Sequence, residues 1–461
     1  MGLERKISDF LKEKGVELCG MAGPERLSGP PSLNPAYTLK GAKSVVSFAL
    51  PMDKSAILDF LGKVSPVPHN LDQVRQNQAV NRISEALSAY IRSLGHGARA
   101  VPANGNYRRH PDAFATLPTF SHRFGAIAAG IAASGLSGNV KTEEYGCAVY
   151  LGSVVTDAAL ASSPRRFGPR RFIDSECARC RLCARSCAAR MMTEDDREEY
   201  VLINGELHPR ALRRNIDLCN AACFGLHSLS PDKKWTTWGH RWIPEWVGKV
   251  PDASNPLALR RTLMLAGMKA GDSTARFDLI RLTGSKTLSA ETISRYLDRH
   301  PENLPEKERR EELSSFARAI GSARPGDFLS EQVLTCGHCA MICGPTAGET
   351  ARRYKALTQG GLVVPGPDGG MVRVKTYEEA AALMERHAPR VPLARRAADA
   401  AASTIIWHRN YFGIEPRSVA EGLLYEARLR RAVKKRYPGH REAGAPRTAR
   451  LARPAPSGGK P

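Results

Sequence analysis

Nine of the eleven cysteines in this chain lie in three short groups, and their spacing is that of metal-binding thiolates. The first group has the pattern C-x2-C-x2-C-x3-C and comprises Cys177, Cys180, Cys183 and Cys187. The second has the pattern C-x2-C-x3-C and comprises Cys336, Cys339 and Cys343, and the third is the pair Cys219 and Cys223. In a chain of 461 residues, such clustering favours metal or redox chemistry over disulfides.

The spacing predicts two 4Fe–4S clusters. A two-residue gap lets neighbouring thiolates reach adjacent irons of one cubane, whereas the cysteine after a longer gap ligates the other cluster. Cluster one would then take Cys177, Cys180, Cys183 and Cys343. Cluster two would take Cys187, Cys336 and Cys339, with Cys219 favoured over Cys223 as its fourth ligand. We therefore expect two motifs that are distant in sequence to converge in space.

Structural zinc is the alternative for paired cysteines, but zinc sites seldom use four cysteines at this spacing. Cys19 and Cys147 stand alone in apolar, strand-like sequence. We expect them to be small core residues.

The elements that must position these cysteines are those of an α+β protein. Residues 1–15 form a predicted amphipathic helix with Ile7, Phe10 and Leu11 on one face. Apolar periodicity predicts a long helix over 71–94 that ends at Gly95, and a helix of small residues over 120–133. Four strands are expected, over residues 16–19, 43–50, 97–103 and 147–156.

Charge is large and uneven along the chain. The formal net charge is +22, and residues 428–461 hold eleven Lys or Arg against the single acid Glu442. Such a field attracts polyanions, nucleic acid above all, although a solvated tail is the plainer interpretation. We find neither an apolar run long enough for a bilayer nor a signal peptide, so the expected location is the cytoplasm and no membrane partner is expected.

Four of the five tryptophans lie in residues 235–246, beside His240 and Arg241. This composition suits stacking on nucleotides or capping of a substrate pocket. Packing of the segment against the cysteine region is the alternative.

The stretch from Phe120 to Asp157, followed by the first and then the second cysteine motif, resembles the epoxyqueuosine reductases and the related corrinoid-dependent reductive dehalogenases. The resemblance implies a nitroreductase-like α+β domain that binds a corrinoid, followed by a ferredoxin-like two-cluster domain with a helical insertion. The corresponding ranges are 1–165 for the first domain, 166–225 and 331–365 for the second, 226–330 for the insertion, and 366–461 for a helical C-terminal region with a basic tail.

The resemblance also implies site residues. The cofactor-binding positions of its glycine-rich signature fall on Gly130, Gly135, Gly138, Thr142, Glu144, Tyr145 and Gly146. The epoxyqueuosine reductases carry a proton-donating aspartate where this chain has Thr116, and the nearest acid is Asp112. Candidate catalytic residues are therefore Asp112, His122 and Tyr145, with Tyr107 and Arg123 as further donors and a structural role as the alternative for each.

The implied activity is that of a cobalamin-dependent oxidoreductase. The clusters would deliver single electrons to a corrinoid that reduces an electrophilic substrate, with ferredoxin or flavodoxin as the low-potential donor and tRNA as a partner of the basic surface. One alternative is an electron-transfer or corrinoid-reactivating protein without its own substrate. Another is a nucleic-acid-binding protein with structural metal.

Overall fold

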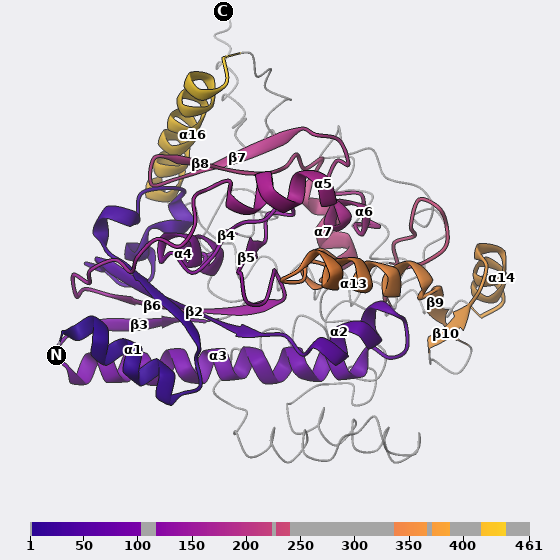
Figure 1. The fold of residues 1–461 in the computed structure, drawn as a ribbon, viewed down its shortest axis with the longest axis horizontal. Coiled ribbons are helices and arrows are strands. Elements are labelled where there is room, and N and C mark those ends of the chain that lie inside the picture. Colours follow the sequence, from indigo (N-terminus) through magenta and orange to yellow (C-terminus); the bar gives the residue numbers. More distant parts are fainter. Residues whose placement is uncertain are drawn as a thin grey trace, which may run out of the picture.

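The computed structural model describes residues 2–102, 117–223, 227–239, 336–366, 371–387 and 416–438. Within this part, a sheet with helices on both faces forms the base of the molecule, and the cysteine-bearing turns lie above it (Figure 1). Several predicted features fall outside the described residues: Tyr107, Asp112, Thr116, most of the 226–330 insertion, and the tail beyond residue 438.

The sheet is antiparallel and has the strand order β1-β2-β6-β3. Its strands are β1 (Leu18–Ala22), β2 (Ser44–Pro51), β6 (Val149–Thr156) and β3 (Ala98–Val101). Seven of the eight residues of β2 are buried, because helices cover the sheet on both faces. All four predicted strands are confirmed, with β1 beginning two residues later than expected.

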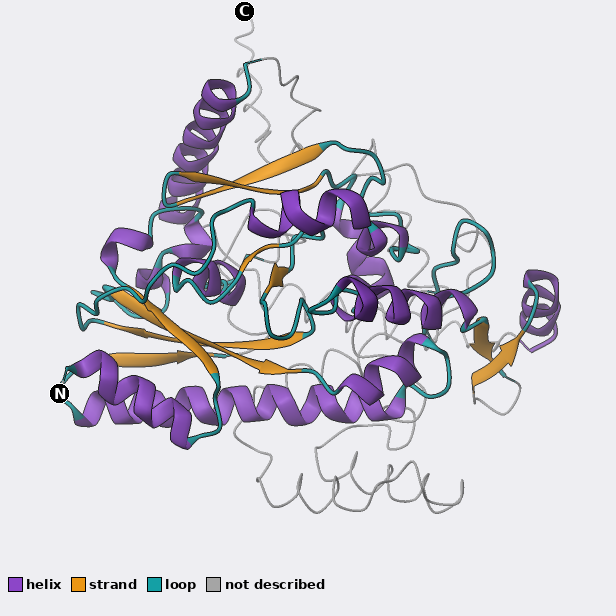
Figure 2. Cartoon of the chain, in the orientation of Figure 1, coloured by secondary structure: helices purple, strands orange, loops and turns teal. Residues whose placement is uncertain are grey.

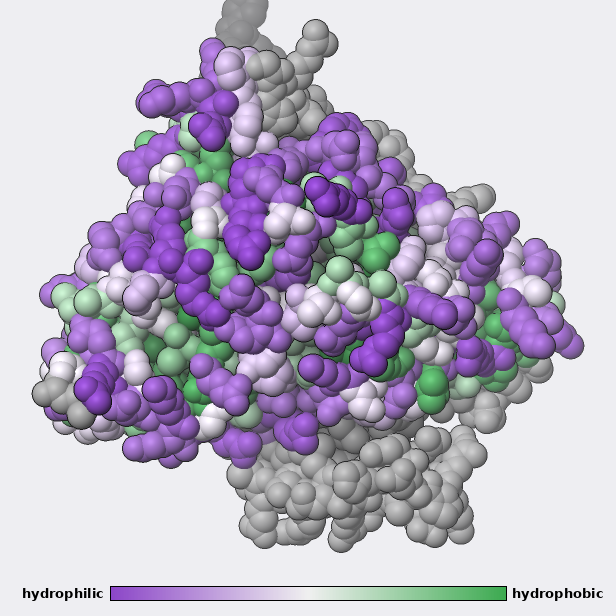
Figure 3. Space-filling view, in the orientation of Figure 1, coloured by the Kyte–Doolittle hydropathy of each residue, from purple (hydrophilic) through white to green (hydrophobic). Residues whose placement is uncertain are grey.

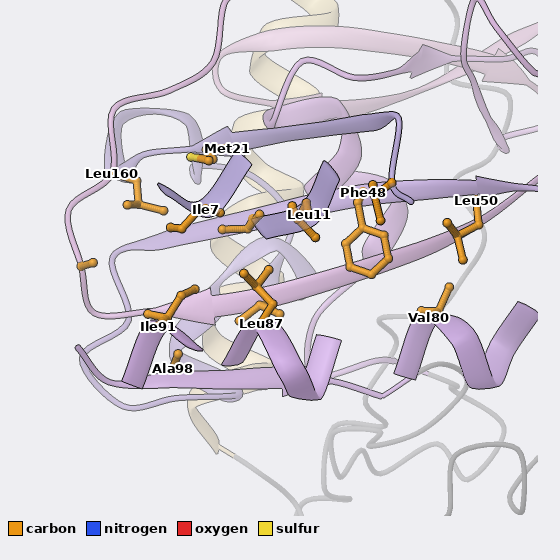
Figure 4. Packing of buried hydrophobic residues seen from close by; sticks show 14 of the residues in the cluster. Ile7, Leu11, Met21, Phe48, Leu50, Val80, Leu87, Ile91, Ala98 and Leu160 are labelled. Atoms are coloured by element: carbon orange, nitrogen blue, oxygen red, sulfur yellow. The ribbon is translucent and has the colours of Figure 1, made fainter. Parts of the chain in front are cut away.

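One face of the sheet is covered by α1 (Leu3–Glu13) and the long helix α3 (Val67–Ser93). Their apolar side chains pack with those of β2 and β6 in one core, shown in Figure 4. Ile7 and Leu11 are fully buried there, as the amphipathic pattern predicted, and Phe10 stacks on Tyr90 with ring centroids 4.6 Å apart. Gly95, with a φ of 87°, follows the end of α3. The long helix α3 is visible along the sheet in Figure 2.

The opposite face carries α4 (His122–Ala128), which contacts β2 and β6. The predicted helix over 120–133 is therefore too long. Gly130 takes a left-handed φ of 78°, and the chain then enters the short strands β4 (Ala133–Ser134) and β5 (Val140–Lys141). The small apolar residues after Ala128 continue the helical pattern in sequence, but the glycine ends it in the structure.

Three single-turn helices connect β1 to β2: η1 (Pro24–Arg26), η2 (Pro31–Leu33) and η3 (Pro35–Tyr37). The short helix α2 (Lys54–Leu61) follows β2, and Asp53 accepts a hydrogen bond from Ala56 N at its start. The cysteine region contains η4 (Ile173–Cys177), α5 (Ala178–Cys180), α6 (Leu182–Arg185), the hairpin β7 (Glu198–Ile203) and β8 (Glu206–Ala211), and α7 (Ile216–Cys223).

The chain after residue 336 forms α12 (His338–Met341), α13 (Ala347–Gln359), the hairpin β9 (Leu362–Pro365) and β10 (Met371–Val374), and α14 (Tyr377–His387). The helix α16 (Pro416–Arg436) packs along β7 and β8 at the edge of the molecule.

Two side chains of α16 bond to the rest of the protein. The Tyr425 hydroxyl accepts a hydrogen bond from Leu202 N at 2.9 Å. Glu421 accepts from the Tyr37 hydroxyl at 3.0 Å. These contacts hold α16 to both the hairpin and the N-terminal part.

Hydrophilic side chains predominate over α16 and most of the face in Figure 3. Among the described helices, none has the length and apolar character needed to cross a bilayer.

Candidate metal centre

The first cysteine motif is folded into a series of short helical turns. η4 ends at Cys177, and α5 and α6 follow with Arg181 between them. Arg181 adopts a left-handed φ of 48°, so the turns do not continue as one helix. The cysteines at two-residue spacing therefore lie around a tight bend, and Cys187 comes after α6.

The second motif is held by α13. Gly337, with a φ of 62°, starts α12. The guanidinium of Arg353, which is 2% exposed, donates to Met341 O at 2.9 Å and pairs with Glu349. A buried arginine with these partners fixes the loop that carries the cysteines.

The structure brings the two motifs together in one buried apolar cluster, which we call the cysteine core. Its apolar wall includes Phe172, Ile173 and Met191. Cysteines from both motifs and from α7 belong to it or pack against it: Cys177, Cys183, Cys187, Cys219, Cys336 and Cys339. The side chain of Cys223 lies outside the described part, so the preference for Cys219 stays a prediction.

Electrostatic effects show that thiols of the two motifs lie near one another. Burial raises the pKa of Cys177 to about 12, and Cys343 and Cys180 act in the same direction. Burial raises the pKa of Cys183 well above its ordinary value, and Cys343, Cys177 and Cys339 act in the same direction. Burial and then Cys339 raise the pKa of Cys187 to about 11. Thiols that disfavour one another's ionisation lie close together, and iron would stabilise them as thiolates.

Nitrogen donors are directed at several of these sulfurs. Asn139 Nδ2 donates to Cys339 Sγ at 3.2 Å, and Met191 N donates to Cys187 Sγ at 3.3 Å. The backbone N–H of Leu136 hydrogen-bonds Cys177 and favours its thiolate. Hydrogen bonds to ligand sulfurs are a feature of iron–sulfur sites, where they help to set the reduction potential.

The glycine-rich segment thus contacts the cysteine core. Gly135 N donates to Asn139 O at 2.8 Å, closing the turn that presents Leu136 and Asn139. A Cβ atom at Gly135 would lie 3.3 Å from Cys147 Sγ, and one at Gly146 would overlap Cys343 O and Gly344. The backbone of Cys343 and Gly344 lies against Gly146, which has a left-handed φ of 66°. Both features favour glycine at this position.

Cys147 is the site residue that sequence reasoning missed. It is buried, as predicted, but its N–H donates to Cys343 O at 2.9 Å and its thiol hydrogen-bonds the Cys343 sulfur. That bond lowers the pKa of Cys343, while Cys147 keeps its proton. A lone cysteine has no spacing that signals a ligand neighbourhood, and only its place beside Gly146 could have suggested one.

Two buried lysines accompany the cysteines. Lys141 is 3% exposed and pairs with Glu176, which directly precedes Cys177. Burial lowers the pKa of Lys141, but the attraction of Cys343 and Glu176 outweighs it, so the net shift is upward. Burial lowers the pKa of Lys63 to about 7, opposed by Cys336. Cations beside these sulfurs suit an anionic cluster.

The two predicted catalytic side chains that the structure describes, His122 and Tyr145, bond to different partners. His122 is half-buried, with Nδ1 2.9 Å from Ser153 Oγ on β6. The Tyr145 hydroxyl donates to Glu17 at 2.8 Å; burial and Glu17 raise the pKa of Tyr145 to about 12. These contacts give each side chain a structural partner, and their catalytic roles stay predictions.

The remaining signature residues are engaged with the protein itself. Thr142 Oγ1 accepts from Tyr145 N at 3.1 Å, and Glu144 pairs with Arg166 at 2.6 Å.

Trp235 and Trp238 are buried, and Trp238 Nε1 donates to Phe60 O at 2.7 Å. For these two tryptophans packing is thus observed; Trp242 and Trp246 lie outside the described residues.

The donor set fits 4Fe–4S clusters. Across the described ranges, no three His, Cys, Asp or Glu side chains are arranged around a single metal ion. A cubane takes each thiolate on a different iron, so its ligands surround a volume and need not converge on one point. Six cysteines in or against one apolar core, with nitrogen donors and two buried ammonium groups beside the cysteine motifs, match that requirement.

The described residues do not show a fit to a corrinoid. Gly130, Gly135 and Gly146 face the chain's own atoms. The cavity beside Gly138 and Arg123 has a volume of about 20 Å³, which is room for roughly one water. The corrinoid role of the glycine signature therefore remains a prediction.

No protein-family model and no curated protein sequence matches the chain. The solved structures to which it is similar include reductive dehalogenases and epoxyqueuosine reductases. A reductive dehalogenase described as B12-dependent matches at 14% identity with a TM-score of 0.36, over 86% of this chain and 49% of that one. The catabolic reductive dehalogenase NpRdhA matches at 16% with a TM-score of 0.35, over 60% and 35%.

The epoxyqueuosine reductase from Bacillus subtilis matches at 16% identity with a TM-score of 0.30, over 69% of this chain and 98% of that one. An epoxyqueuosine reductase bound to a tRNA stem loop matches at 15%, also with a TM-score of 0.30, over 69% and 99%. The chain spans between 28% and 49% of the dehalogenase chains.

Replacing Gly146 with alanine is expected to prevent most iron binding. The added Cβ would overlap Cys343 O, and the left-handed φ costs a non-glycine residue roughly 1–2 kcal/mol. The measurement is iron and sulfide per chain after anaerobic reconstitution. Gly41→Ala is the matched control, because Gly41 has a φ of 82° but nothing within 4 Å of its added Cβ. A full iron complement in Gly146→Ala would show that this docking contact is dispensable.

Proposed function

We propose that this protein is an iron–sulfur reductase that passes single electrons through two 4Fe–4S clusters. The observation that supports this most directly is the convergence of cysteines from residues 177–187 and 336–343 in one buried core. Cys177, Cys180, Cys183 and Cys343 would hold cluster one. Cys187, Cys219, Cys336 and Cys339 would hold cluster two. When bound, such clusters carry one electron each at low potential.

The protein's own residues supply the environment. Phe172, Ile173 and Met191 pack in the cysteine core and limit its contact with water, which lowers the local dielectric and strengthens each electrostatic contact. The N–H groups of Leu136 and Met191 and the amide of Asn139 bind ligand sulfurs. This wall and these donors fix where the thiolates lie and how strongly negative charge is stabilised on them.

Replacing Cys180 with serine is expected to remove about half of the bound iron, because one cubane of two loses a ligand. Cys19→Ser is the matched control: Cys19 lies in β1 and packs in the core beneath the sheet, away from the motifs. Iron and acid-labile sulfide are measured on protein prepared without oxygen. Undiminished iron in Cys180→Ser would disprove its ligand role, and zinc in place of iron in the unmodified protein would disprove the proposed function.

The acceptor we propose is a corrinoid, cobalamin, which would reduce an electrophilic substrate. Its support is the resemblance of residues 120–157 to the epoxyqueuosine reductases and corrinoid-dependent dehalogenases. The described glycines face the protein itself. The physiological donor would be a low-potential ferredoxin or flavodoxin.

Cobalt analysis decides between this reductase and a two-cluster electron-transfer or corrinoid-reactivating protein. Anaerobic incubation with excess cobalamin, followed by gel filtration, is expected to leave about one cobalt per chain alongside the iron. Serum albumin treated identically measures nonspecific carry-over. Full iron without cobalt would favour the electron carrier and reject the corrinoid.

We also propose that α16 contacts the phosphate backbone of RNA, tRNA being the partner that the resemblance implies. All six cations in its last nine residues are exposed: Arg428, Arg430, Arg431, Lys434, Lys435 and Arg436. A cationic helix of this kind neutralises phosphates and releases their counterions.

Replacing Arg431, Lys434 and Lys435 with glutamine is expected to weaken tRNA binding and to flatten its salt dependence. The slope of log K against log salt should fall in magnitude by about 0.7–0.9 for each phosphate that is no longer neutralised. Fluorescence anisotropy at low and at high salt measures the tRNA affinity from which this slope is obtained. Substituting Lys6, Lys12 and Lys14 near α1 controls for net charge, and equal slopes in the two triple variants would reject α16 as the contact surface.

A further inference from the structure

Lys63 is a buried cation without a conventional partner. It follows α2, is 3% exposed, and its Nζ has no hydrogen-bond partner among the described residues. The ammonium lies 5.6 Å from the ring centroids of both Phe60 and Trp238. Contacts with two ring faces attract an ammonium but do not provide the counter-charge that a buried ion requires.

Aromatic side chains near Lys63 contact the second cysteine motif. Phe60 contacts His338 with ring centroids 5.9 Å apart, and Trp235 contacts the same imidazole at 5.6 Å. His338 stands between Cys336 and Cys339 in the chain. Cys336 raises the pKa of Lys63, whereas burial and Arg373 lower it. The missing counter-charge therefore lies on the side of cluster two.

The stem of Lys63 is also held in place. A Cβ at Gly360, which follows α13, would lie 2.8 Å from Lys63 Cγ. Trp238, whose ring lies near the ammonium, is fixed by its bond to Phe60 O at 2.7 Å. The charge is thus positioned by packing from α2, α13 and the tryptophan segment.

The other buried lysine differs in one respect. Lys141 lies near Cys343 and thus near cluster one, but Glu176 pairs with it and neutralises it. An oxidised cubane with four thiolates is a dianion, and one-electron reduction makes it a trianion. An uncompensated cation in a low-dielectric site stabilises the more negative form, so the two clusters would experience unequal fields.

We propose that Lys63 raises the reduction potential of cluster two above that of cluster one, so that cluster two is the first to be reduced. This rests on the proposed function, because it requires both clusters. The step is the gain of one electron from a low-potential donor; no bond is made or broken, and the negative charge of the reduced cluster favours the protonated form of Lys63. Lys63 is a positioning residue, since it acts through the ligand shell.

The test measures each cluster alone in anaerobically reconstituted full-length protein. Cys180→Ser leaves cluster two, and Cys339→Ser leaves cluster one. EPR-monitored titration with dithionite is expected to give cluster two the higher potential. Adding Lys63→Met to Cys180→Ser should make its reduction at least tenfold less favourable, a shift of about 59 mV or more to lower potential. Lys63→Arg should restore most of it.

Lys54→Met on the exposed side of α2 is the matched control and should leave both potentials unchanged. If Lys63→Met binds less iron, Lys63→Gln replaces it in the same comparison. Two outcomes would overturn the inference: an unchanged cluster-two potential when the charge is removed, or a higher potential for cluster one than for cluster two while Lys63 is present. In either case a full iron content would still support the proposed function. Absence of iron in the unmodified chain would instead overturn the function itself.

Discussion

The concentration of ionisable sulfur in one apolar core is the constraint on which the rest of this structure depends. Thiolates out of water repel one another, and a buried charge without compensation is strongly unfavourable. The chain supplies compensation from several directions: N–H groups of Leu136 and Met191, the Asn139 amide, and the ammonium groups of Lys63 and Lys141. The irons proposed for this core would supply the remainder.

The second cysteine motif contacts the chain just before β6 begins. Cys147 N–H donates to Cys343 O, and the absence of a side chain at Gly146 lets the second motif approach the sheet. On its other side the second motif is fixed by Arg353 and Thr350 of α13. The sheet and its helices thus form the base on which the second motif docks. The apolar core between the sheet and helices α1 and α3 supports that base.

Much of this could be predicted from the sequence where a period or a spacing exists. The apolar periodicity identified α1, β2, α3 and β6, and the cysteine intervals predicted that two remote motifs meet. The helix over 120–133 was predicted too long, because the alanines beyond Gly130 are equally compatible with a helix and with the turn that is observed.

Single residues could not be predicted in this way. Cys147, Lys63 and Lys141 have no spacing partner, and their positions depend on tertiary packing between segments far apart in the chain. The glycine segment was interpreted through its resemblance to corrinoid-binding proteins. Its described contacts are with the cysteine core, and this could not be inferred from glycine spacing alone, because glycine permits close approach to any neighbour.

The order in which the ribosome makes these segments has a consequence for maturation. The first motif is complete at Cys187, but Cys343, which closes the core against Cys147, is 156 residues further along. At about 5–20 residues per second, translation of that interval takes roughly 10–30 s. During that time the second motif cannot yet cover the thiols of the first motif, which are exposed to oxidants and to other metal ions. Neither proposed cluster has all of its ligands until the second motif has been made, so completion of both clusters follows the synthesis of Cys343.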